Sequence, residues 1–174
     1  MRFIEEDVSD AVPEIIKVMP TYSKANGLLS FCFVDPFSAK LDFNVFRHLS
    51  SRYRMDFLVL LMLGRDIRTN FQRYYQDDTD TRIGDLVADE SWRNEWVDRG
   101  LRARHLIWFV LTKFSKAMSN LGYQQTTLDE AAPVRIAHGN VLQYYLVLYS
   151  KHSLGRKLWR ETQKTVDPQM GLEL

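Results

Sequence analysis

The stretch Leu28-Leu-Ser-Phe-Cys-Phe-Val34, which runs directly into Asp35-Pro36-Phe37, decides the fold. A short and nearly continuous apolar run is typical of a strand that is covered on both faces of a sheet. Pro36 lacks a backbone N–H and cannot continue the hydrogen-bonded ladder, so the strand ends there. A second run of this kind, Met55 to Leu63, ends at Gly64.

Amphipathic segments alternate with these apolar runs. One lies between them and carries Val45, Phe46 and Leu49 at helical spacing, and a longer one extends from Leu106 to Met118. Alternation of this kind indicates strands and helices that build a largely parallel sheet. The sequence therefore predicts a single α/β domain over residues 1–174, with a mostly parallel, Rossmann-like sheet and helices on both faces.

Both ends of the chain are predicted to add strands. Met1 to Glu5 is interpreted as a short strand, and we expect Arg2 to Glu5 to pair in parallel with Leu28 to Val34 through a right-handed crossover. Near the C-terminus, Gly139-Asn140 is typical of a tight turn between two β-rich segments, Val134 to His138 and Val141 to Tyr149. This pattern predicts a C-terminal antiparallel hairpin.

Two further segments are predicted to be helical. The periodicity changes after Gly64, so residues 65–102 are interpreted as a helical insertion that carries Trp92 and Trp96. A basic helix is predicted from Ser153 to Lys164, with three apolar side chains facing inward: Leu154, Leu158 and Trp159.

Bulk properties exclude several classes of protein. The formal net charge is +1, so any binding of nucleic acid would have to be local. The longest apolar runs are far shorter than the roughly 20 residues that span a bilayer, and the N-terminus is acidic, so a cytoplasmic protein without membrane contact is expected. Cys32 is interpreted as a buried thiol, and the four histidines lack the spacing of a metal site, so no metal is expected.

Several blocks of sequence resemble a known family. Phe33-Val34-Asp35-Pro36-Phe37 resembles the strand-end motif of class I methyltransferases, although the second proline of that motif is absent. Together with Leu63 to Asp66, Trp92 to Trp96 and Tyr144 to His152, residues 32–37 are similar to the three-Cys-motif partner (TcmP) family. The resemblance implies that this chain corresponds to the later part of a member, with the glycine-rich cofactor-binding strands preceding Met1.

The resemblance assigns the target site to Asp35, Pro36 and Phe37. In amino-methyltransferases the acidic group and the proline carbonyl accept hydrogen bonds from the target amine, and the aromatic ring stacks on an extruded base. This places Asp35 at the carboxyl end of a strand, where ligands bind in open α/β sheets. The alternative is an ordinary strand-ending loop in which Asp35 caps local amides.

Other polar residues are weaker candidates. The resemblance places Asp7 where the cofactor's adenine amine is bound, whereas the alternative is a solvated helix N-terminus. Asp66 and Arg68 follow the second buried strand and are candidates for substrate binding, with a helix start as the alternative. Lys151 and His152 follow the last strand and are also substrate-binding candidates, with capping of the final helix as the alternative.

These observations give one main hypothesis and two alternatives. The main one is a TcmP-like protein that is inactive or dependent on a partner, with S-adenosylmethionine as the cofactor implied by resemblance and a three-Cys-motif companion as partner. One alternative is a non-catalytic interaction module that uses Trp92, Trp96 and the last helix. The other is the substrate half of a split methyltransferase acting on nucleic acid, which predicts an exposed apolar sheet edge beside Leu28 to Val34.

Overall fold

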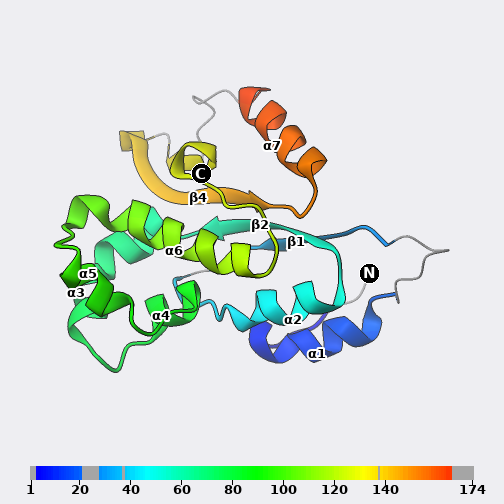
Figure 1. The fold of residues 1–174 in the computed structure, drawn as a ribbon, viewed down its shortest axis with the longest axis horizontal. Helices are drawn as coiled ribbons and strands as arrows, with labels where there is room; N and C mark the ends of the chain where they lie inside the picture. Colours follow the sequence, from blue (N-terminus) through cyan, green and yellow to red (C-terminus); the bar gives the residue numbers. More distant parts are fainter. Residues whose placement is uncertain (1–2, 21–27, 37, 137, 166–174) are drawn as a thin grey trace.

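The computed structural model of the chain describes residues 3–20, 28–36, 38–136 and 138–165 (Figure 1). In this part of the chain, strands and helices form an α/β fold, which confirms the predicted class. The sheet has four strands in the order β1-β2-β4-β3. Their bounds are β1 (Ser30–Val34), β2 (Met55–Leu61), β3 (Ala132–Ile136) and β4 (Val141–Tyr149).

Helices connect and cover the strands. The α-helices are α1 (Val8–Val18), α2 (Asn44–Arg52), α3 (Arg68–Gln76), α4 (Arg82–Val87), α5 (Trp92–Asp98), α6 (Leu106–Asn120) and α7 (Ser153–Thr165). The shorter ones are a π-helix, η1 (Leu63–Ile67), and three 3-10 helices, η2 (Ala103–His105), η3 (Leu128–Glu130) and η4 (His138–Asn140). None of the helices in the described residues is long and apolar enough to cross a membrane.

The sheet is mixed, so the prediction of a mostly parallel sheet is wrong. β1 and β2 are parallel, but β4 is antiparallel to both of its neighbours, β2 and β3. A short connection reverses the chain between β3 and β4, and strands joined in this way can pair only in an antiparallel direction. Because β4 lies between β2 and β3, two of the three strand pairs in this sheet, β2–β4 and β3–β4, are antiparallel.

Aromatic side chains fill the core on one face of the sheet. Phe57 of β2 lies 5.1 Å from Phe46 of α2, measured between ring centroids, and Tyr149 of β4 lies 5.5 Å from Phe114 of α6. All four side chains are fully buried. The apolar spacing of α2 and α6 thus directs one side of each helix onto the same face of the sheet.

The described residues cover the second face of the sheet only in part. The start of α7 lies over it, because a Cβ on Gly155 would come within 3.3 Å of the Asp56 carboxylate, and Asp56 alternates with the core-facing residues of β2. Phe33, Leu58 and Leu148 form a row across β1, β2 and β4 on this face. Leu58 and Leu148 are half-buried, whereas Phe33 is 52% exposed.

The outer edge of β1 is unpaired within the described residues. Phe3 to Glu5 do not form a strand, so the expected pairing with β1 is wrong for these residues, and Met1 and Arg2 lie outside the described part. Asp7 instead begins α1 as its N-cap, and α1 packs against α2 (Figure 1). The N-terminal segment therefore enters a helical layer and leaves the β1 edge open.

The tryptophans of the predicted insertion are core residues. Residues 65–102 contain α3, α4, α5 and most of η1, and Trp92 and Trp96 are only 1% and 6% exposed. Trp96 lies 5.2 Å from Phe109 of α6, so these helices share the main core. The alternative in which Trp92 and Trp96 supply a contact surface is wrong, because both rings are buried in the core and cannot reach a partner.

Two other burial predictions differ from the structure. Leu154 and Leu158, expected to face inward, are 54% and 59% exposed, because α7 docks through polar contacts of its other side. Cys32 is only partly buried, although burial still raises the pKa of its thiol.

Candidate functional site

The carboxyl ends of β1 and β2 lie side by side because the two strands are parallel and in register from Ser30 opposite Met55 to Val34 opposite Val59. Asp35 and Pro36 follow β1 at this edge, and η1 follows β2. Ligands of open α/β sheets bind at the carboxyl ends of the parallel strands, so this edge is the candidate binding site. Phe37, the third residue of the predicted target motif, lies outside the described residues.

The carboxylate of Asp35 is exposed, and Pro36 is half-buried. Asp66 of η1 holds the segment around Ala39, which follows Pro36 in the chain. The Ala39 amide donates a hydrogen bond to Oδ2 of Asp66 at 2.5 Å, which ties the loop after β1 to the helix after β2. Asp35 directly follows β1, and the Ala39 amide ties the described segment that begins at Ser38 to η1.

Asp66 is occupied by hydrogen bonds from within the chain. Besides the Ala39 amide, its carboxylate accepts from Nδ2 of Asn70 at 2.6 Å and from the Tyr74 hydroxyl at 2.7 Å. Burial opposes ionisation of Asp66, but these hydrogen bonds outweigh it, so the pKa of this carboxyl lies below its ordinary value. Asp66 acts here as an ionised anchor of the edge rather than as an open ligand group.

Tyr74 and Arg82 complete this anchor. Burial and the hydrogen bond to the Asp66 carboxylate raise the pKa of the Tyr74 hydroxyl. The Arg82 guanidinium lies 5.1 Å from the centroid of the Tyr74 ring, within the range of a cation–π interaction. Sequence reasoning did not select Tyr74 or Arg82, because their contact with Asp66 spans separate helices and leaves no local pattern.

Asp7 lies near the same edge. Its carboxylate accepts a hydrogen bond from the Ser9 amide as the N-cap of α1, and this bond is the main cause of its lowered pKa. Oδ2 of Asp7 also lies 3.7 Å from Nζ of Lys40, which follows Ala39 in the loop after β1. Both contacts fit the helix N-terminus that the sequence left as the alternative.

A basic pocket extends the edge toward β4. It encloses about 690 Å³ between α3, the start of β4 and the N-terminal part of α6. Arg68 and Arg135 contribute positive charge to its lining, together with Thr69, Asn140 and Tyr145. Arg135 donates from Nη1 to the Asn140 carbonyl at 3.1 Å. Arg68 is a predicted substrate-binding residue, and the structure shows that Arg135 lines the same pocket. The two residues come together because β3 and β4 lie next to α3 at this pocket.

Close packing of η1 against β4 shapes the floor of this pocket. A Cβ on Gly64 would lie 2.3 Å from the Leu142 carbonyl oxygen, closer than real Cβ atoms come to another atom. A glycine is therefore needed at position 64 for the close approach of two backbone segments. The side on which another residue would carry its side chain faces the Leu142 backbone. It does not provide the backbone cradle that a cofactor phosphate or carboxylate would use.

Lys151 and His152 lie at the opposite end of the sheet. They follow β4, whose Tyr149 is opposite Phe57 near the start of β2, whereas Asp66 follows the end of β2. The seven residues of β2 span about 20 Å at the usual rise of a strand. Nδ1 of His152 accepts a hydrogen bond from the Leu154 amide, as the capping alternative predicted.

The arrangement at the carboxyl edge combines an exposed carboxylate with two arginines. Asp35 can accept hydrogen bonds from an amine, and Arg68 and Arg135 in the separate basic pocket can bind an anionic group. No cluster of three or more metal-ligating side chains occurs in the part of the chain that the structure describes.

The chain was compared with protein-family models, with curated proteins and with solved structures, and none of these comparisons found a match.

Proposed function

We propose that this chain forms the target-binding end of a class I methyltransferase-like domain of the three-Cys-motif partner type. The observation that carries the proposal is the sheet order β1-β2-β4-β3 with an antiparallel last strand inserted next to β2. An antiparallel pair that closes a sheet after a long helix is how class I methyltransferase folds end. Asp35 and Pro36 then stand where the target motif of that fold is expected.

The chemistry of the edge supports a target that carries an amino group and an anionic group. Asp35 is exposed and free to accept a hydrogen bond from the amine, which would orient the nitrogen lone pair. Arg68 and Arg135 line the basic pocket toward β4 and would bind phosphate or carboxylate groups of a target long enough to reach both places. A nucleobase in a nucleic acid has both features.

The described residues do not fit S-adenosylmethionine. Gly64 is packed against the Leu142 carbonyl, and Asp7 is engaged by the Ser9 amide and lies near Lys40, so neither offers a free cofactor contact. We propose that cofactor binding needs polypeptide beyond the described residues.

The edge of β1, which no strand of the described residues pairs with, supports this need for additional polypeptide. A strand added there would meet unpaired backbone groups and continue the sheet, as in β-strand addition between proteins. Phe33 lies on this edge strand and is 52% exposed, so an added strand would lie beside its ring. A three-Cys-motif companion is the partner that the family resemblance implies.

Calorimetric titration with S-adenosylhomocysteine tests the proposal. We expect no binding by the chain alone and micromolar binding after the three-Cys-motif companion has been added. Phe33→Lys should weaken the assembly, because a charge would enter the apolar row, whereas Val97→Lys, at a similarly exposed apolar position on α5, should not.

The outcomes separate the parts of the proposal. Micromolar binding by the chain alone would refute dependence on a partner. Assembly with the companion without any binding of S-adenosylhomocysteine would refute the methyltransferase assignment and favour a non-catalytic interaction module whose contact surface includes the exposed Phe31 and Phe33 instead of Trp92 and Trp96.

A further inference from the structure

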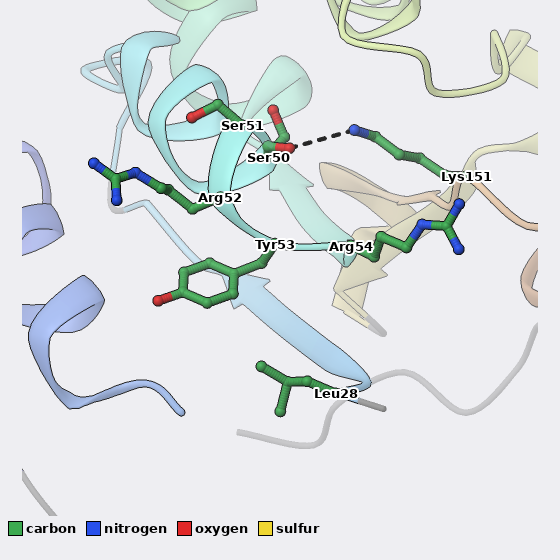
Figure 2. A pocket seen from close by; sticks show the side chains of 7 residues that line it. All are labelled: Leu28, Ser50, Ser51, Arg52, Tyr53, Arg54 and Lys151. Carbon is green, nitrogen blue, oxygen red and sulfur yellow. Dashed lines mark hydrogen bonds between the residues drawn. The ribbon is translucent and has the colours of Figure 1, made fainter. Parts of the chain in front are cut away.

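A second basic pocket lies at the amino end of β2, across the sheet from Asp35 (Figure 2). It encloses about 560 Å³ between the end of α2 and the segment after β4. Seven residues line it: Leu28, Ser50, Ser51, Arg52, Tyr53, Arg54 and Lys151. We propose that this pocket binds a phosphoryl group, presented either by a small phosphorylated molecule or by the backbone of a nucleic acid.

The charge of the lining carries the argument. Arg52, Arg54 and Lys151 bring three positive charges, and none of the other described lining residues bears a carboxylate. In Figure 2, Arg54 and Lys151 lie on one flank of the pocket and Arg52 lies on the other. Of these cations, Arg54 and Lys151 are close enough to repel each other, and an anion between them would offset that repulsion.

The ammonium group of Lys151 is held at the pocket without an acidic partner among the described residues. Its Nζ donates to the Ser50 carbonyl at 3.5 Å and lies 4.7 Å from the centroid of the Tyr123 ring. Burial lowers the pKa of Lys151, and the positive charge of Arg54 lowers it further. A bound anion would act in the opposite direction and favour the charged form of Lys151.

The donor set suits phosphate rather than a smaller anion. The Arg54 guanidinium offers a planar pair of N–H donors, and the Lys151 ammonium on the same side adds a compact point charge, which together match the several oxygens of a phosphoryl group. Lys151 contacts the carbonyl at the end of α2, so it partly offsets the negative end of that helix toward an incoming anion.

Calorimetry at low ionic strength tests the site with two probes, sodium pyrophosphate and a short single-stranded DNA. The variant R52Q/R54Q removes two cations whose side chains are exposed. The control R65Q/R73Q removes the same charge from exposed arginines of η1 and α3. We expect at least one probe to bind, roughly tenfold more weakly to R52Q/R54Q than to the wild type, and with little change in the control.

The two probes distinguish the source of the phosphoryl group. Tighter binding of pyrophosphate would support a small phosphorylated ligand. Tighter binding of DNA, with a salt dependence whose slope falls by about one per cation removed, would support a nucleic-acid backbone. Equal weakening by both double variants, or no binding of either probe to the wild type, would refute the site.

Discussion

At the scale of single residues, Asp66 is the side chain that holds the candidate edge together. Its carboxylate accepts from the Ala39 amide, from Asn70 and from the Tyr74 hydroxyl, which belong to the loop after β1 and to α3. We expect Asp66→Asn to lower the free energy of unfolding by about 1–3 kcal/mol, because the amide places a donor against groups that donate to it. Urea denaturation at neutral pH measures this loss.

The loss of unfolding free energy in Asp66→Asn should depend on pH. Because the pKa of Asp66 is lower in the folded chain than in the unfolded one, its ionised form stabilises the fold above the unfolded pKa of about 3.9. That contribution falls as the pH drops through the folded value. The difference between wild type and Asp66→Asn should therefore shrink in acid. A difference that stays constant from neutral pH to below pH ~3 would contradict the role given to the charge.

At the scale of elements, one residue of η3, Glu130, makes most of the polar contacts of α7 with the rest of the fold. The Glu130 carboxylate pairs with the guanidinium groups of Arg156 and Arg160, and its backbone carbonyl accepts from Nε1 of Trp159 at 3.0 Å. Burial raises the pKa of Glu130, but the bonds from Arg156 and Arg160 outweigh it and leave the pKa lowered. Polar contacts replace the apolar packing that the sequence of α7 predicted.

Loss of the Glu130 carboxylate should loosen α7 without unfolding the core. In Glu130→Gln we expect the amides of α7 to exchange with solvent roughly tenfold faster, which corresponds to about 1.4 kcal/mol, while those of α6 stay unchanged. Hydrogen-exchange mass spectrometry measures both helices at once. Glu161→Gln is the matched control, since its pair with Lys164 is largely exposed. Equal acceleration in the two variants would show that Glu130 does not anchor α7.

At the scale of the whole molecule, the described fold has one unfinished side. The edge of β1 is unpaired there, and Phe31 and Phe33 are 60% and 52% exposed beside it. An open edge strand with apolar side chains promotes association between copies. We expect the isolated chain to self-associate as its concentration rises, and Phe33→Lys to shift it toward the monomer in sedimentation velocity. Val97→Lys should leave the association unchanged, and a wild type that stays monomeric at every concentration would contradict the prediction.

The amino-acid sequence by itself determined the α/β class and the cores of β1, β2, α2 and α6. These elements follow from local signals, because a continuous apolar run indicates a buried strand and apolar residues three and four apart indicate a helix. The sequence also placed Asp35 at the carboxyl end of a strand, since Pro36 stops the ladder there.

Only the tertiary structure decided which residues meet. It buried Trp92 and Trp96, left Leu154 exposed, and set Asp66 and Lys151 at opposite ends of the sheet. It also brought Arg135 to the pocket of Arg68. The physical reason is that burial and proximity depend on the direction and packing of elements far apart in sequence, and local periodicity carries no record of either.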